Sequence, residues 1–157
     1  MPAKARDIME SHVVTLSPEE PLVTAHRVFV EDRIHGAPVV DEQGRIVGII
    51  TSTDLLRAVF EEHDTAGWHV EYLRELLEFS GPDWGSGTSD FQDRLTSLCV
   101  ADFMNEHIVS VGPDTPVNEV AQTLRKAGIH RVLVIEKDEL LGIITTFDLL
   151  EVLEKNA

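Results

Sequence analysis

The feature that most constrains this fold is an internal duplication, because a chain that contains itself twice is expected to fold as two like units. A shift of 95 positions superimposes residues 7–43 on 102–138, and after the loss of one residue a shift of 94 superimposes 45–56 on 139–150. Sixteen of the 49 aligned positions are identical, and they include paired prolines, paired histidines and the segment Gly-Ile-Ile-Thr-x-x-Asp-Leu-Leu. A chance excess of isoleucine would not align all of these residue types at once.

Each copy predicts the order strand, helix, strand, strand, helix. Residues 12–21 and 107–116 are short extended pieces that end at prolines, and Pro21 is a favourable first residue for the helix that follows. APVV and RIVGIIT are β-branched runs joined by DEQG, which predicts a hairpin with Gly44 in its turn. STDLLRAVFEEH and TFDLLEVLEK carry apolar residues at helical spacing.

These patterns predict an α+β fold with pseudo-twofold symmetry. The first motif spans residues 1–60, an inserted helical and loop segment spans 61–100, and the second motif spans 101–157. A single unit of about fifty residues buries too little apolar surface to be stable alone. The two βαββα motifs are therefore expected to pack sheet against sheet, with helices on the outside.

The inserted segment has its own helical signals. WHVEYLRELLEF predicts an amphipathic helix over residues 68–79, and Asp90 can cap a further short helix that carries Phe91, Leu95 and Leu98. One interpretation is an amphipathic hairpin laid on the two motifs. The other is a docking element for a partner, to which Trp84 in a Gly- and Ser-rich loop points.

Composition limits the class of partner and the compartment. The chain has 28 acidic and 13 basic residues, and the resulting net charge of −15 repels phosphate backbones and anionic membranes. The single cysteine, Cys99, cannot form an internal disulfide, which is typical of a reducing compartment. No apolar run approaches the ~18 residues of a membrane span. We therefore expect a cytoplasmic protein that neither contacts nucleic acid nor inserts into a membrane.

The repeated Thr-x-x-Asp segment is the best candidate for a binding function. A helix N-terminus attracts oxyanions, so Thr51 and Thr145 can add hydroxyl donors for a phosphate. Asp54 and Asp148 can accept hydrogen bonds from a vicinal diol such as ribose. The same spacing is also a relative of the capping box, in which case these residues only stabilise the helix. The recurrence of the segment leaves both interpretations open.

Other repeated residues flank this segment. Gly48 and Gly142 lie inside strands, where glycine indicates a bulge or the close approach of another group, either protein or ligand. His35 and His130 directly precede the hairpin strands, and Arg131 offers a fork of donors for a phosphate. Both histidines are equally compatible with a solvated or capping role.

The sequence offers no catalytic constellation. It lacks a Gly-x-Ser-x-Gly elbow, and GSGTSD lacks the lysine of a phosphate-binding P-loop. Cys99 lies between Leu98 and Val100, which favours a buried, inert thiol. No histidine pair has metal-ligand spacing with a third ligand nearby. We therefore expect a protein that is not an enzyme, with no metal and no catalytic cofactor.

The two copies resemble the CBS (cystathionine β-synthase) domain, and the pair resembles a Bateman module. The resemblance rests on RDIMESHVVTLSPEEPL with ADFMNEHIVSVGPDTPV, and on HGAPVVDEQGRIVGIITSTDLL with IHRVLVIEKDELLGIITTFDLL. It covers about residues 5–60 and 100–154 and leaves the inserted segment outside. It implies a pseudo-twofold pair whose cleft holds an adenosine derivative and which regulates another protein.

The resemblance also implies roles for individual residues. It assigns ribose binding to Asp54 and Asp148, and phosphate contacts to Thr51, Thr145 and Arg131. The first copy has Gly36 where the second has Arg131, which implies unequal sites or a ligand of different charge. The full expected ligand-binding set is Thr15, Leu16, His35, Ala37, Pro38, Val39, Thr51, Asp54, Ser110, Val111, His130, Arg131, Val132, Leu133, Thr145 and Asp148.

We therefore expect a regulatory protein that senses AMP, ADP or ATP in the cleft, with S-adenosylmethionine and NAD as secondary candidates. It would act on a separate protein in trans and form a homodimer through its apolar helices. The alternative is a purely structural dimerisation module, in which the cleft is a packing seam and the aspartates are helix caps.

Overall fold

A computed structural model describes residues 2–61 and 89–156 of the chain. The helices and strands before the gap are α1 (Ala5–Ile8), α2 (Leu22–Asp32), β1 (Gly36–Val40), β2 (Ile46–Thr51) and α3 (Ser52–Glu61). Those after it are α5 (Ser89–Ser97), α6 (Val100–Phe103), β3 (Ser110–Val111), α7 (Val117–Ala127), β4 (Arg131–Glu136), β5 (Glu139–Thr145) and α8 (Thr146–Asn156). The predicted α+β fold of two like motifs is confirmed. The helix expected over residues 68–79 and the loop after it lie outside the described residues.

Each motif is built on an antiparallel hairpin, as the β-branched runs predict. Strands β1 and β2 pair in the first motif, and β4 pairs with β5 in the second. Gly44 has a φ of 78° in the first turn, where the Asp41 carboxylate accepts hydrogen bonds from the N–H groups of Gln43 and Arg45, both at 2.9 Å. The second turn has only Lys137 and Asp138 between its strands, both with positive φ. This shorter turn explains the residue lost between the repeats.

The first predicted strand of each motif is shorter than the sequence pattern suggests. In the second motif it is the two-residue β3, which pairs in parallel with β4. In the first motif it is a single bridge, in which the N–H of Leu16 donates to the carbonyl of Pro38 at 3.0 Å and the N–H of Val40 donates to the carbonyl of Leu16 at 2.9 Å. The prediction that Pro21 starts the next helix was wrong by one residue. Pro21 is the extended N-cap, with a ψ of 151°, and α2 begins at Leu22.

The described end of the inserted segment belongs to the first core. Helix α5 packs against α2 and α3, and the Leu95 side chain is fully buried there. Asp90 lies inside α5, which begins at Ser89, so it does not occupy the expected cap position. Because α5 covers α3, the α3 residues Leu55, Ala58 and Val59 are also fully buried. In the part of the chain that the structure describes, no helix covers the equivalent helix α8 in this way, and its Leu150 and Leu153 are exposed.

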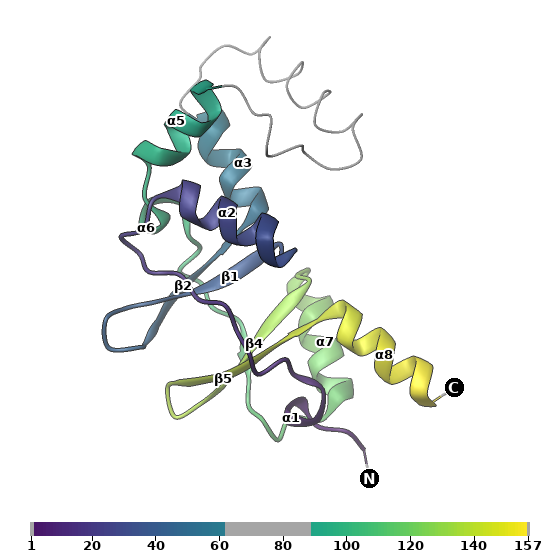
Figure 1. Cartoon of the computed structure of the whole chain (residues 1–157). Helices are drawn as coiled ribbons and strands as arrows, with labels where there is room; N and C mark the ends of the chain where they lie inside the picture. The colour runs from purple at the N-terminus through teal and green to yellow at the C-terminus, as the bar shows by residue number, and fades with distance from the viewer. Residues whose placement is uncertain (1, 62–88, 157) are drawn as a thin grey trace.

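The two motifs exchange short segments, as Figure 1 shows for α1, which lies among the elements of the second motif. Helix α1 contacts β5 and α8, and Ala5 is fully buried in the second core. In return, α6 contacts α3, and Val100 and Phe103 belong to the first core. Each motif thus completes its core with a segment from the other. None of the described helices combines the length and apolar character needed to cross a bilayer.

Candidate functional site

A cleft of about 1020 Å³ opens between the two motifs and is lined by both. Its walls include four pairs of residues that are equivalent in the repeat, which the pseudo-twofold brings to one place. These pairs are His12 and His107, His35 and His130, Thr51 and Thr145, and Asp54 and Asp148. The volume suits a ligand of nucleotide size.

At the first motif's edge of the cleft, Asp54 closes the start of helix α3. Its Oδ2 accepts hydrogen bonds from the N–H of Thr51 at 2.8 Å and from the Thr51 hydroxyl at 3.0 Å. The N–H of Asp54 donates back to the Thr51 Oγ1 at 3.4 Å, which completes a reciprocal capping box. The other oxygen, Oδ1, lies 3.7 Å from the Arg57 guanidinium. The capping interpretation of this segment is therefore correct for Oδ2.

Asp148 repeats this geometry at the start of α8. Its Oδ2 accepts hydrogen bonds from the N–H of Thr145 at 2.8 Å and from the Thr145 hydroxyl at 3.2 Å. Within residues 2–61 and 89–156, Oδ1 of Asp148 accepts no hydrogen bond, and Asp148 lines the cleft. A cap uses one carboxylate oxygen and leaves the second for a ligand, so the two interpretations are compatible.

Arg131 lines the cleft, and its side chain reaches across to Gly36 of the first motif. A Cβ atom built on Gly36 would lie 2.8 Å from the Arg131 Nη1, so the guanidinium occupies the space that a side chain at position 36 would need. Burial lowers the pKa of the Arg131 guanidinium, and the charge of Asp54 opposes that lowering. Arginine stays protonated despite such shifts. Glycine at position 36 is thus the counterpart of the arginine at 131, because the two guanidinium groups would not both fit.

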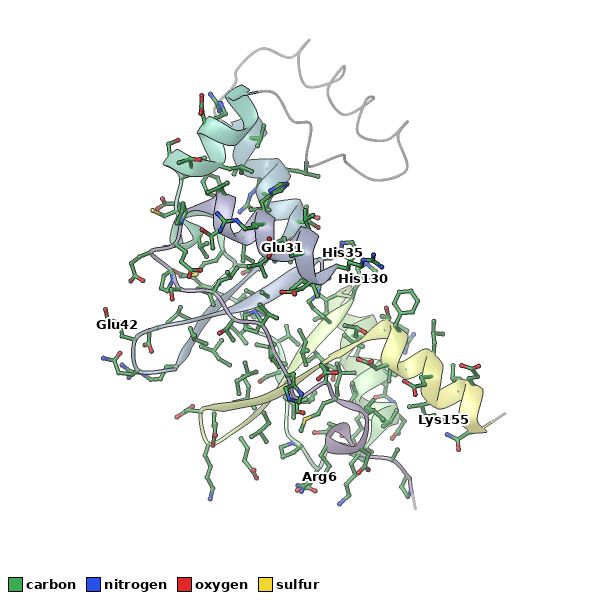
Figure 2. The ribbon with its side chains drawn as sticks, viewed as in Figure 1. Arg6, Glu31, His35, Glu42, His130 and Lys155 are labelled. Atoms are coloured by element: carbon green, nitrogen blue, oxygen red, sulfur yellow. The ribbon has the colours of Figure 1, made fainter. Side chains whose placement is uncertain are left out.

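His35 and His130 precede the hairpin strands and project where the two motifs meet, as Figure 2 shows. Their carbonyl oxygens accept hydrogen bonds from the first N–H groups of the cleft helices. Ser52 donates to His35 at 2.9 Å, and Thr146 donates to His130 at 3.1 Å. These backbone bonds fix both helix N-termini against the cleft and leave the imidazole rings to line it.

The group that approaches each strand glycine is an exchanged protein segment and not a ligand. A Cβ on Gly48 would lie 2.8 Å from the Met104 Sδ and 3.0 Å from the Asn105 carbonyl oxygen. A Cβ on Gly142 would lie 2.7 Å from the Met9 Sδ and 2.8 Å from the Glu10 carbonyl oxygen. Both glycines also lie next to a register shift in the hairpin. The close approach and the irregular pairing expected from the sequence therefore both occur.

The expected ligand-binding residues divide into two groups. Half of them line the cleft: His35, Pro38, Thr51, Asp54, His130, Arg131, Thr145 and Asp148. The other half are not part of its lining. Leu16, Ala37, Val39, Val132 and Leu133 are buried in the interior, whereas Thr15 and Ser110 are exposed and Val111 is half-buried. Their ligand contacts stay a prediction that rests on the family resemblance.

Sequence reasoning missed several residues of the cleft. Val14 and Val109 line it one residue before the expected strand ends, and Ile34 and Ile129 line it next to the histidines. Both pairs are identical in the repeat alignment, which was the available signal. Phe147 also lines the cleft and is 79% exposed, but it has no identical partner in the first copy.

No group of three or more histidine, cysteine or acidic side chains is arranged to hold a metal ion in the part of the chain that the structure describes. The cleft instead offers helix N-termini, hydroxyls, the carboxylates of Glu10, Asp54 and Asp148, and the guanidinium groups of Arg33 and Arg131. Such donors and acceptors suit a small molecule that carries both an oxyanion and a diol.

The sequence matches a known family over most of its length. The CBS domain model matches residues 5–61 and 100–155. The uncharacterised protein MJ1426 of Methanocaldococcus jannaschii is 27% identical over 152 residues, which cover 94% of this chain and 89% of the relative. The 5'-AMP-activated protein kinase subunit gamma-3 of Homo sapiens is 28% identical over 134 residues, which cover 85% of this chain but 23% of that protein.

Solved structures share the fold. The CBS domain of a CBS domain-containing membrane protein from Sphaerobacter thermophilus has a TM-score of 0.71 at 30% identity, over 96% of this chain and 87% of that one. The CBS domain pair of protein MJ0100, in complex with 5'-methylthioadenosine and S-adenosyl-L-methionine, has a TM-score of 0.70 at 21% identity, over all of both chains. CBSX2 in complex with AMP has a TM-score of 0.70 at 19% identity, over 98% and 97%.

Proposed function

This chain belongs to the CBS domain family, of which it carries two copies, and we propose that it is a regulatory module that binds an adenosine-derived ligand in the cleft between them. The observation that carries the proposal is the duplicated Thr-Asp arrangement. Two helix N-termini, each with one aspartate oxygen left over from its cap, face a single cleft of about 1020 Å³. A capping role alone does not explain why both helix N-termini lie at the same cleft.

The proposed division of labour follows from the donors and acceptors. A ribose diol donates two hydrogen bonds to the remaining oxygen of Asp54 or Asp148. A phosphate accepts from the Arg131 guanidinium and from hydroxyls at the helix N-termini. Ile34 and Ile129 supply apolar surface for the adenine ring. Charge-assisted hydrogen bonds of this kind contribute ~1.5–3 kcal/mol each.

Two structures with this fold support the ligand class. MJ0100 was solved with two adenosine derivatives and CBSX2 with AMP. We propose AMP, ADP or ATP for this chain, because Arg131 offers a permanent cation to a phosphate. S-adenosylmethionine and NAD are secondary candidates. No residue of the cleft is proposed to catalyse a reaction, and the ligand's effect is proposed to reach a separate protein in trans.

We also propose that two copies of the chain associate through α8. Both α3 and α8 were expected to contribute apolar surface to a homodimer. Leu55, Ala58 and Val59 of α3 are instead buried within the chain, whereas Leu150 is 56% and Leu153 is 67% exposed on α8. Light scattering of the purified protein should give twice the mass of 17.5 kDa, and Leu153→Glu should return it to the monomer. A wild-type mass near 17.5 kDa at tens of micromolar would refute this part of the proposal.

The binding proposal is tested by calorimetric titration with AMP, ADP, ATP, S-adenosylmethionine and NAD. We expect at least one to bind, and to stabilise the fold by about 2.7 kcal/mol at a hundred times its dissociation constant. Asp54→Ala and Asp148→Ala each remove one carboxylate, and each should weaken binding at its own half of the cleft at least tenfold, because the loss of one such interaction exceeds 1.4 kcal/mol. A 2'-deoxynucleotide should weaken binding to the wild-type protein in the same way.

The matched control is Asp138→Asn. Asp138 lies in the β4–β5 turn with a φ of 65°, which asparagine also adopts, and it does not line the cleft. Its variant should bind like the wild type. If no adenosine derivative changes the heat or the melting temperature at millimolar concentration, the cleft is a packing seam. The structural dimerisation module is then the correct description.

A further inference from the structure

The two motifs differ in and around the cleft at several positions that the repeat makes equivalent. Arg33, Arg57 and Thr53 of the first motif correspond to Gly128, Glu151 and Phe147 of the second, and Gly36 corresponds to Arg131. Every one of these differences alters the charge or polarity beside Asp54 relative to Asp148. We propose that the half of the cleft at Asp54 binds a phosphorylated ligand, whereas the half at Asp148 binds an uncharged nucleoside. This inference rests on the proposed function.

Cations gather at the first half. The Arg131 guanidinium crosses from the second motif, packs against Gly36 and lies within electrostatic reach of Asp54. Arg57 lies 3.7 Å from the same carboxylate and donates to the Phe103 carbonyl at 3.0 Å. Arg33 lines the cleft from the end of α2. The sequence assigns Arg131 to the second site, whereas its guanidinium lies against Gly36 of the first motif.

Among residues 2–61 and 89–156, the second half has no such set of cations. Gly128 stands where the first motif has Arg33, and Glu151 stands where it has Arg57. Glu151 is paired with Lys155 at 2.7 Å on the exposed side of α8. The paired histidines, His35 with His130 and His12 with His107, occur in both motifs and do not distinguish the halves. A second anionic group at Asp148 would therefore find a carboxylate and no nearby arginine.

The second half of the cleft has an aromatic side chain, Phe147, where the first half has polar and charged groups. Phe147 is the second residue of α8 and precedes Asp148 in the sequence. It lines the cleft and is 79% exposed. A large aromatic side chain left in the open beside a carboxylate gives a flat apolar surface next to a hydrogen-bond acceptor. Those two groups match the base and the diol of a nucleoside. The equivalent Thr53 can offer only a hydroxyl, which suits a phosphate oxygen instead.

The experiment compares AMP with adenosine, which share the base and the diol but differ in charge. Arg131→Gln should weaken the tighter AMP-binding event at least tenfold and change adenosine affinity less than twofold. Phe147→Thr, which copies the first motif, should weaken adenosine at least fivefold and change AMP affinity less than twofold. Protein saturated with one equivalent of AMP should still bind one equivalent of adenosine.

The matched control for charge is Arg125→Gln, because Arg125 is an exposed arginine on α7 that does not line the cleft. It should leave both affinities unchanged. Melting temperatures of all variants exclude unfolding as the cause of lost binding, and Arg131→Lys should retain part of the AMP affinity. If Arg131→Gln and Phe147→Thr each weaken both ligands equally, the division of the cleft is refuted while the proposed function stands. If the wild type binds neither ligand, the division of the cleft is refuted, and the proposed function is refuted as well if ADP, ATP, S-adenosylmethionine and NAD also fail to bind.

Discussion

Replacement of Gly142 by alanine tests how tightly the exchanged segment is held. The new Cβ would lie 2.8 Å from the Glu10 carbonyl oxygen, which is backbone and cannot rotate away as the nearby Met9 side chain can. The segment must therefore shift. Such a shift loosens two hydrogen bonds, from the N–H of Glu10 to Ile143 at 2.9 Å and from the N–H of Ile143 to Glu10 at 3.0 Å.

The magnitude follows from these contacts. Overpacking a close contact costs about 1–3 kcal/mol, and each weakened hydrogen bond costs up to about 0.5–1.5 kcal/mol. We expect Gly142→Ala to lower the free energy of unfolding by about 2–4 kcal/mol. For a chain of this size that lowers the melting temperature by roughly 5–15 °C. Gly48→Ala should cost less, because its nearest backbone atom, the Asn105 oxygen, would lie at 3.0 Å.

The assay is urea or thermal unfolding followed by circular dichroism, with Gly112→Ala as the matched control. A Cβ on Gly112 would meet only the Thr115 Oγ1 at 3.7 Å, an ordinary contact, so its variant should stay within about 0.5 kcal/mol of the wild type. Equal free energies of unfolding for Gly142→Ala and Gly112→Ala would refute the prediction, because they would show that the segment shifts without loss of stability.

Two further predictions concern the first core. Burial lowers the pKa of His26 below 6.5, so the unfolded chain binds more protons than the folded chain. The free energy of unfolding should therefore fall as the pH drops below about 6.5. In urea titrations at several pH values, His26→Gln should flatten this dependence, and an unchanged slope would contradict the prediction. Leu95→Ala should lower the free energy of unfolding by about 2–5 kcal/mol in the same titrations, because Leu95 is fully buried. Val30→Ala, at a position that is 45% exposed, should lower it little. Similar losses of stability in the two variants would mean that α5 is not part of the core.

Local patterns were sufficient to predict the hairpins, the two main helices of each motif and the Thr-Asp caps. They depend on neighbouring residues, such as the β-branched runs of the strands and the three-residue spacing from Thr51 to Asp54. The exchange of α1 and α6 was not predictable in this way, since four-residue helices carry little periodic signal and the elements that they contact lie far away in the sequence.

The same limit applies to the cleft. The repeat alignment identifies Gly36 and Arg131 as different, but it cannot tell which motif the guanidinium reaches. That depends on the space left by the missing Cβ at position 36, which only the packed structure reveals. Phe147 was not predicted for a related reason: the repeat alignment indicates positions that are identical in the two copies, and the equivalent position is Thr53.

The exchange of segments has a consequence for how the two halves came to differ. A chain with one motif could complete its core only by exchanging its first segment with an identical chain. Every substitution would then occur twice, once in each chain, on either side of the symmetry axis. An arginine at position 36 of such a pair would meet its own copy. Once both motifs share one covalent chain, each position can change alone. Gly36 can yield space to Arg131, and Phe147 can arise without a second phenylalanine at Thr53.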